Sequence, residues 1–415
     1  MRVSYLRAAI LALGLCGALT GCGKSFSART TPRGSVPASV PSRGGAVSID
    51  TTNTTRLGGA TPIIDAAAVA IAAYPGLTPA TRPRAAVLVD DGDWPGALAA
   101  SVLTGAPLHA PLLYSEGATL PEASNLALRA MGPRGTGALG AKTSDTANRT
   151  QVIGIGQTAT PPGYVTRLLT GNEPAALAVT IERLSSTLRG HAPHQVIVTA
   201  ANGPPAMTMP AAGLSAQTGA PILFVSRASI PRATAAELTR LGRTAIYIVG
   251  PSAVVSKAVA RELMRFGSVT RIAGATPASN AIAVARFSDG SFGWGVVEPG
   301  HGLVFANSSR PLDAPAAAPL SASGDYGPLL LLEGPDELSG ELSSYLSDLQ
   351  PGSPPSGPVH GVYNHGWLIG DEDAISARTQ AQLDSVLGIS SRPAVEPTVA
   401  SPTTPSSEST PSAEP

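Results

Sequence analysis

The chain has 415 residues, and its 28 lysines and arginines balance 28 aspartates and glutamates. Because proteins that bind nucleic acid generally carry an excess of basic residues, this balance argues against DNA or RNA as a partner. Only 4% of the residues are aromatic, which argues against a stacking surface for single strands and against an aromatic-lined sugar cleft. The 43% of hydrophobic residues can build sizeable cores, and the length predicts about two to four domains.

Residues 1–21 are predicted to be a signal peptide. Arg2 and Arg7 supply positive charge, and the almost wholly apolar run 8–18 follows them. This run is shorter than the roughly 20 residues that span a bilayer, so we interpret it as a signal peptide and not as a stable membrane helix. Arginines far outnumber lysines along the chain, which is typical of high-GC genomes such as those of actinobacteria.

The end of this segment, Leu19-Thr20-Gly21-Cys22, resembles the lipobox of bacterial lipoproteins, in which the Cys is acylated and becomes the first residue. Cys16 would be removed with the signal peptide, so Cys22 would have no partner for a disulfide. We favour lipidation of Cys22 over an ordinary Cys because it lies where cleavage is expected. The prediction is therefore a membrane partner held through an N-terminal lipid on the extracytoplasmic face.

Two segments of low complexity flank the body of the chain. Residues 22–49 are rich in Ser, Thr, Pro, Arg and Gly, and are predicted to be a flexible tether. Residues 389–415 are dominated by Ser, Thr and Pro and hold no aromatic residue, so we expect them to be disordered. This tail could thread through a wall mesh or carry O-glycans, or it could be a passive solubilising tail.

Three stretches of the body align, and each begins with Arg and has a Gly three residues before a Pro. They are Arg56–Pro62, Arg167–Pro174 and Arg271–Pro277. Each predicts a short strand that ends at Gly, followed by an Ala-rich helix with Pro in its first turn and, in two cases, Thr61 or Thr276 as the N-cap. The repeats are predicted to span residues 50–166, 167–270 and 271–388.

Further elements recur in the same order in each repeat. The first predicted buried strands are Ala85–Val89, Gln195–Thr199 and Gly302–Ala306, each followed by a helix of small residues. The next strands lie within Ala110–Leu113, Ala220–Leu223 and Gly327–Leu330, and the helices after them are opened by Pro121, Pro231 and Asp336. The closing strands are Val152–Gly156, Ile246–Gly250 and Trp367–Gly370. This alternation predicts an α/β fold of parallel sheets with helices on both faces.

The Arg-x-x-Gly start, the Ala-rich helix, the Ala-Pro-Ile-Leu run at 220–223 and the closing aliphatic strand resemble the type-2 cell-wall-binding repeat. The resemblance covers about residues 50–388. It implies three tandem Rossmann-like units in a pseudo-threefold arrangement. It also implies non-covalent attachment to a cell-wall polymer, typically an anionic glycan, with no cofactor and no enzymatic activity in the repeats.

The sequence departs from the family pattern at two places. A second Arg of the family is replaced by Pro62, Pro174 and Pro277. The Asp that the family carries on its second helix corresponds to Gly96, Ala206 and Asp313, so only the third repeat keeps it. The loss of three cationic positions weakens the expectation of an anionic ligand.

Arg56, Arg167 and Arg271 recur at one position of each repeat and are the predicted polymer-binding residues. A guanidinium used three times suits repeated contact with phosphate or carboxylate groups. The alternative is that these arginines form ion pairs between neighbouring repeats.

Two acidic clusters are weaker candidates. Asp90, Asp91 and Asp93 follow the first strand of repeat one and could bind a cation or a sugar hydroxyl, although Pro95 favours a helix N-terminus there. His365 with Asp371 and Asp373 could form a metal or acid/base site, or simply a solvated loop before a capped helix.

Taken together, the predictions describe a lipid-anchored, non-enzymatic wall-binding protein with no resident metal or cofactor. Gly154-x-Gly156 lacks the rest of a dinucleotide-binding motif, and we interpret it as a strand end. The alternatives are a solute-binding lipoprotein of a transport system, which usually has two lobes instead of three equivalent units, and a degenerate envelope enzyme with a site around His365 and Asp371.

Overall fold

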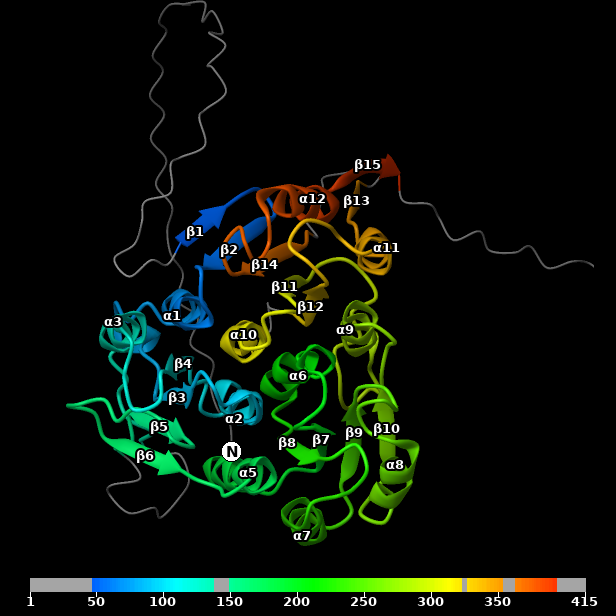
Figure 1. The fold of residues 1–415 in the computed structure, drawn as a ribbon. Coiled ribbons are helices and arrows are strands. Elements are labelled where there is room, and N and C mark those ends of the chain that lie inside the picture. Colours follow the sequence, from blue (N-terminus) through cyan, green and yellow to red (C-terminus); the bar gives the residue numbers. More distant parts are fainter. Residues whose placement is uncertain (1–46, 138–148, 323–326, 354–362, 394–415) are drawn as a thin grey trace, which may run out of the picture. The chain divides into compact units, whose positions relative to one another are not determined.

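The computed structural model describes residues 47–137, 149–322, 327–353 and 363–393 (Figure 1). The predicted signal peptide, the predicted lipidation site Cys22, most of the predicted tether and the part of the tail beyond residue 393 lie outside the described residues. Within the described ranges, no helix combines the length and the apolar character that a membrane crossing would need.

The described residues form three large sheets in which one strand order recurs (Figure 1). The first sheet runs β4 (Leu112–Ser115), β3 (Ala86–Asp90), β5 (Val152–Ile155), β6 (Thr166–Leu169). The second runs β8 (Ile222–Val225), β7 (Gln195–Ala200), β9 (Ala245–Val249), β10 (Val269–Ile272). The third runs β12 (Leu329–Leu332), β11 (Gly302–Asn307), β14 (His365–Ile369), β2 (Thr54–Gly58), β1 (Val47–Asp50). A separate two-stranded sheet pairs β13 (Gly352–Ser353) with β15 (Ser390–Pro393).

Every pairing in the three large sheets is parallel except the antiparallel pair β1–β2 at the edge of the third. The predicted α/β class with parallel sheets is therefore confirmed. The three continuous apolar runs that follow Pro111, Pro221 and Pro328 form β4, β8 and β12, whose residues are all buried. Such runs are typical of parallel strands that are covered on both faces.

The sheets do not follow the sequence repeats one to one. Strand β6 carries Arg167 and pairs with β5, and strand β10 carries Arg271 and pairs with β9. Strand β2 carries Arg56 and joins the third sheet, where Arg56 lies opposite Leu368. The predicted boundaries 166/167 and 270/271 thus fall inside β6 and β10, and the first long strand of the chain completes the last sheet.

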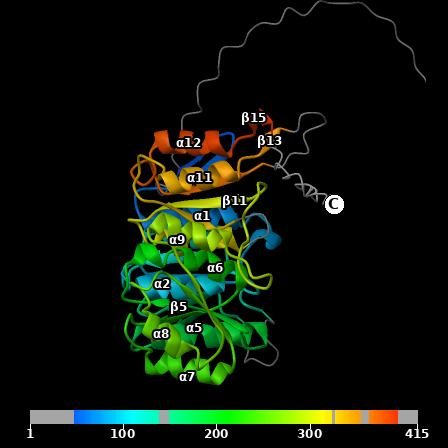
Figure 2. The same ribbon diagram turned by 90° about the vertical axis from the view of Figure 1, so that its right-hand side faces the viewer.

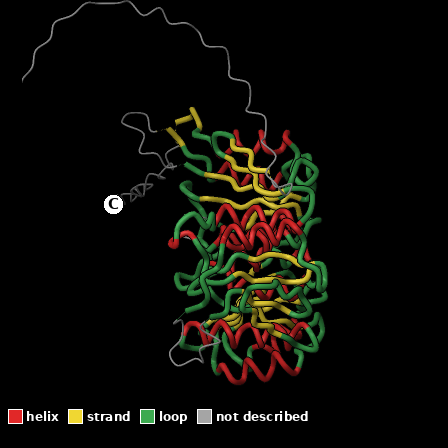
Figure 3. The backbone as a smooth tube through the Cα atoms, turned by 90° about the vertical axis from the view of Figure 1, so that its left-hand side faces the viewer, coloured by secondary structure: helices red, strands yellow, loops and turns green. Residues whose placement is uncertain are grey.

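Helices cover both faces of the sheets, as the alternation of helices and strands in Figures 2 and 3 shows. We call each large sheet together with its covering helices a unit. The first unit contains α1 (Pro62–Ala73), α2 (Trp94–Ala100) and α3 (Glu122–Met131). The second contains α5 (Pro174–Arg189), α6 (Pro210–Thr218), α7 (Arg232–Leu241) and α8 (Lys257–Leu263). The third contains α9 (Pro277–Arg286), α10 (Asp313–Ser321), α11 (Gly340–Asp348) and α12 (Ala377–Leu387). Short 3-10 helices are η1 (Pro79–Thr81), η2 (Ser101–Thr104) and η3 (Pro205–Met207).

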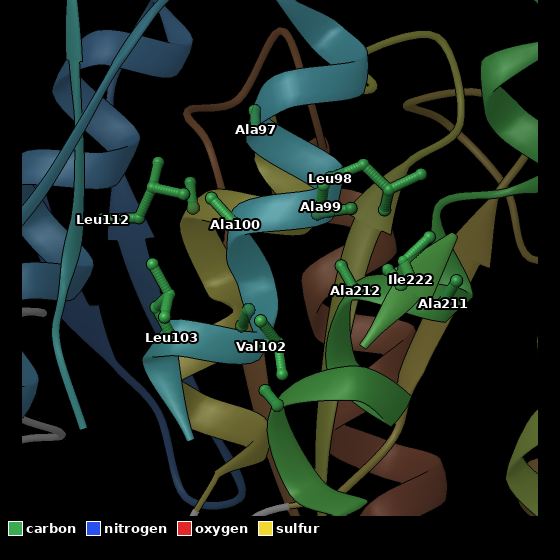
Figure 4. Packing of buried hydrophobic residues seen from close by; sticks show 14 of the residues in the cluster. Ala97, Leu98, Ala99, Ala100, Val102, Leu103, Leu112, Ala211, Ala212 and Ile222 are labelled. Carbon is green, nitrogen blue, oxygen red and sulfur yellow. The ribbon is translucent and has the colours of Figure 1, made fainter. Parts of the chain in front are cut away.

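One hydrophobic core is shared by the three units. The inward faces of the sheets contribute Val87, Ile197 and Val304 to it, whereas the outward faces pack into separate clusters. Helices α2, α6 and α10 lie together in this shared core (Figure 1), and Figure 4 shows alanines that α2 and α6 contribute to it. A Cβ atom added at Gly213 of α6 would lie 2.7 Å from Ser321 Oγ of α10, so only small side chains allow this approach.

The structure confirms the helix starts predicted at Thr61 and Thr276, and it contradicts the one predicted at Asp336. Thr61 and Thr276 are N-caps, and a Pro in the first turn of each helix lacks the N–H that would be left unpaired there. Asp336 does not begin the helix of the third repeat. Ser339 does, because its hydroxyl accepts a hydrogen bond from Leu342 N at 3.3 Å, and the chain before it is a turn.

Candidate functional site

Arg56 is buried, with only 1% of its surface exposed. Strand β2 directs its guanidinium onto the loop between β14 and α12. There it donates hydrogen bonds to the carbonyl oxygens of Gly370 at 3.0 Å, Asp371 at 2.6 Å and Ile375 at 2.6 Å, and to Gln380 Oε1 at 3.0 Å. Burial lowers the pKa of Arg56, and the nearby carboxylates oppose this effect. The side chain ties the first repeat to the third.

Arg271 has the same role in the second sheet. It lies on β10 and donates hydrogen bonds to the carbonyl oxygens of Gly250 and Val255, both at 2.7 Å. These residues follow β9 and precede α8, which is the position that Gly370 and Ile375 occupy after β14. Arg271 is only half-buried, and burial lowers its pKa.

Arg167 differs from the other two arginines. It lies on β6, its side chain is exposed, and among the described residues it makes no hydrogen bond or ion pair. The chain after β5 passes through a turn to β6 without the helix start that offers carbonyl oxygens in the other two units. Its neighbour Leu168 is 50% exposed. Of the three predicted polymer-binding residues, Arg167 is therefore the one with a guanidinium free to meet a ligand.

The acidic cluster after β3 is used within the fold. Asp93 is the N-cap of α2 and accepts a hydrogen bond from Gly96 N at 2.9 Å, as expected for the helix N-terminus interpretation. Asp90 Oδ1 accepts a hydrogen bond from Gly117 N at 2.6 Å. Burial raises the pKa of Asp93, the Gly96 hydrogen bond lowers it, and the charge of Asp90 raises it further.

The structure does not bring together the metal or acid/base site that the sequence suggested for His365, Asp371 and Asp373. His365 begins β14 and Asp371 lies two residues beyond its end, so the length of the strand, roughly 13 Å at about 3.3 Å per residue, separates them. His365 Nε2 contacts Thr55 Oγ1 at 3.1 Å, and burial lowers the pKa of His365. Asp371 Oδ1 accepts hydrogen bonds from the backbone N–H groups of Asp373 and Ala374. Among the described residues, no three His, Cys, Asp or Glu side chains are grouped to hold a metal ion.

Sequence reasoning missed a buried charged cluster between the first and third units. Asp65 on α1 forms an ion pair with Arg310, and Arg310 Nε donates to Asp313 Oδ2 at 2.8 Å. The only local signal was the presence of Asp65 in an otherwise apolar, Ala-rich helix. Asp313 was noted as the retained family acid, but nothing local showed that its partner comes from the first unit.

The surface also carries an open groove of about 800 Å³ between α11 and α12. Its lining includes Gln350, Arg378 and Gln382 from the third unit, together with the apolar side chains of Leu338 and Val386. Glu337 also lines the groove, so it can offer hydrogen bonds and one charge of each sign to a ligand, but it does not enclose one.

Comparisons with known proteins agree with the sequence resemblance. The model of a family described as Cell wall binding domain 2 (CWB2) matches residues 169–260. No curated protein matches the chain. Two solved structures from Clostridium difficile are similar to it: Cwp6, with a TM-score of 0.64 and 17% identity, and Cwp8, with a TM-score of 0.60 and 18% identity.

These structural matches cover 82% and 81% of this chain, and 48% and 52% of the Cwp6 and Cwp8 chains. The chain thus spans about half the length of the structures that it matches. At these identities the likeness establishes the fold. The predicted resemblance to the type-2 cell-wall-binding repeat is confirmed, and the family match supports cell-wall binding and a place at the cell envelope.

Proposed function

We propose that this chain is a lipid-anchored, extracytoplasmic protein that attaches non-covalently to a cell-wall polymer through its three α/β units, without catalysing a reaction. The observation that carries this proposal is the match of residues 169–260 to the cell wall binding domain. The lipobox ending at Cys22 supports the anchor. The recurring strand order supports three related units, whose combined attachment would be stronger than that of one.

In this proposal the three arginines act in two ways. Arg167 contacts the polymer directly, because its exposed guanidinium can bind a phosphate or carboxylate group in a bidentate manner. Arg56 and Arg271 are positioning residues that hold the loops 370–375 and 250–255. These loops lie at the carboxyl ends of parallel strands, where open α/β sheets usually bind ligands.

The groove between α11 and α12 suits an extended polymer better than a small solute. Small-molecule sites usually bury most of the ligand, whereas this groove is open to solvent. Its amide groups, with Arg378 and Glu337, can hydrogen-bond to the hydroxyl groups of a glycan. This observation favours the wall-binding function over the solute-binding alternative.

The test is sedimentation of the purified chain 23–415 with isolated cell walls. We expect sedimentation that weakens with added salt and is reduced on walls stripped of their anionic polymers. Arg167→Ala should lower the bound fraction, and Arg243→Ala, which changes another exposed arginine, is the matched control. Absence of sedimentation, together with thermal stabilisation by one small metabolite, would instead support a solute-binding protein.

A further inference from the structure

Helix α1 of the first unit packs against α10 of the third, and we call this contact the first–third joint. At its centre the side chains of Asp65 and Asp313 are completely buried, while that of Arg310 is 18% exposed. Asp65 Oδ1 accepts a hydrogen bond from Gly59 N at 2.7 Å, and Arg310 bridges both carboxyl groups. Two buried acids therefore share a single guanidinium.

The hydrogen-bond geometry leaves one atom unexplained. Asp313 Oδ1 is buried and has no hydrogen-bond partner among the described residues. Arg310 donates to Oδ2 of Asp65 and to Oδ2 of Asp313, so the two carboxyl groups lie against the same guanidinium. A proton between the two carboxyls would provide the missing partner and would leave one negative charge opposite the one positive charge of Arg310.

The joint between the second and third units provides an internal comparison. Asn280 stands three residues after Pro277, as Asp65 stands three residues after Pro62. Asn280 Oδ1 accepts from Gly274 N at 3.0 Å, matching the Gly59–Asp65 hydrogen bond. The other atom of the Asn280 amide, Nδ2, donates to Met207 O of the neighbouring unit at 2.8 Å. At this position of the fold, Asn280 is therefore a neutral side chain that accepts a hydrogen bond from its own loop and donates one across the joint.

We propose that Asp65 and Asp313 hold one proton between them at neutral pH, and that this proton-bound pair with Arg310 makes the first–third joint sensitive to alkaline pH. Removing the proton leaves two buried negative charges facing one positive charge. Their repulsion acts between α1 and α10, so the first and third units are the parts that it separates.

The charged surroundings agree with this proposal. Burial, with the charge of Asp313, raises the pKa of Asp65 to about 9, and burial raises the pKa of Asp313 to about 6. The pair should therefore lose its last proton above neutrality. Because the folded pKa lies above the unfolded value, the stabilisation is complete at low pH and is lost as the pH rises through the folded pKa.

Apart from Arg310, no neighbouring group in the described part of the chain supplies a compensating positive charge. Tyr114 of β4 is fully buried, donates to Leu312 O at 2.6 Å and has a pKa raised well above its usual value by burial and by nearby acids. Asp371, after β14, adds negative charge near Asp313, and Asp91, after β3, adds negative charge near Tyr114. Helices α2 and α6 carry no ionisable residue, and the charged residues of α3, Glu122 and Arg129, are exposed.

The direct test is ¹³C NMR of chain 23–415 labelled only at aspartate carboxyl carbons, so that glutamates are silent. We expect an aspartate signal that stays in the protonated range at pH 7 and titrates at alkaline pH. Asp65→Asn and Asp313→Asn should each abolish this titration. Asp348→Asn, which changes a surface ion pair with Arg286, should leave it unchanged. Ionisation of every aspartate at pH 7, or a titration that survives in both joint variants, would overturn the proposal.

A second measurement starts from the stability of the parent chain. The melting temperature of the parent chain should fall between pH 7 and pH 10, and hydrogen exchange in α1 and α10 should accelerate together over that range. In Asp65→Asn the melting temperature should fall less over the same range, because the remaining carboxylate is matched by Arg310. A melting temperature that is flat in the parent, or that falls equally in the variant, would contradict the proposal.

Discussion

Arg56 and Gln380 are 324 positions apart in the sequence and share a hydrogen bond of 3.0 Å. Gln380 on α12 also donates to the buried Thr54 Oγ1 at 3.2 Å, so it holds both a hydroxyl and the guanidinium of β2. The third sheet is therefore completed by the first long strand of the chain. Folding of the third unit must bring both ends of the body together, which is a contact of high sequence separation.

The first prediction concerns Arg56. Arg56→Met should lower the free energy of unfolding by roughly 3 kcal/mol, because it removes the donor for four acceptors at once, three of them in buried hydrogen bonds. Arg167→Met should change it by less than about 0.5 kcal/mol, because that side chain is exposed. Urea unfolding of the two variants measures the difference. Equal losses would mean that the Arg56 contacts do not stabilise the fold.

The second prediction concerns the shared core. Gly213→Leu should cost about 1–3 kcal/mol, because the added atoms would overlap Ser321 of α10. Ala236→Leu adds apolar bulk on the exposed face of α7 and is the control. Thermal unfolding compares the two variants. A stabilised Gly213→Leu chain would show that α6 and α10 can separate without loss.

The third prediction is a pH dependence in the second unit. Burial, together with Glu237, raises the pKa of Glu182 on α5 to about 7, and Ser186 Oγ donates to its Oε1 at 2.6 Å. Since the unfolded pKa is about 4.3, the protonated form stabilises the fold at low pH and that stabilisation is lost as the pH rises through 7. Glu182→Gln keeps the shape and removes the titration. Relative to this variant, the parent should lose on the order of 2 kcal/mol between pH 4 and pH 8.

The control for this measurement is Glu262→Gln. Glu262 is 45% exposed and pairs with Arg265 on the protein surface, so its substitution should leave the pH profile of the parent unchanged. Denaturant unfolding at several pH values provides the comparison. Parallel profiles for the parent and Glu182→Gln would mean that Glu182 is ionised throughout.

The fourth prediction concerns the anchor. Cys22→Ala should release the protein from the membrane fraction into the medium and prevent incorporation of a labelled fatty acid, because the thiol is the only attachment point in the lipobox. Fractionation followed by immunoblotting measures the release. Retention of the Cys22→Ala chain on membranes that have been stripped of wall would contradict the anchor.

Local patterns were sufficient to predict the elements of this fold. The strands β3, β7 and β11 lie within one or two residues of the predicted ranges, and Thr61 and Thr276 cap the helices that their spacing to Pro indicated. These features depend on neighbours in the sequence: a continuous apolar run, a hydroxyl three residues before a free N–H, and a Pro where no N–H is needed. Apolar runs and caps act over a few residues, so one sequence is enough to recognise them.

The roles of the three arginines could not be obtained in this way. Arg56, Arg167 and Arg271 occupy one repeat position, yet Arg56 is buried, Arg271 is half-buried and Arg167 is exposed. Their environments depend on which loop lies opposite each strand, and for Arg56 that loop is supplied by residues 370–375. The buried pair of Asp65 and Asp313 likewise joins two units. Local periodicity sets the strands and helices, whereas burial and charge depend on long-range packing that only the folded chain defines.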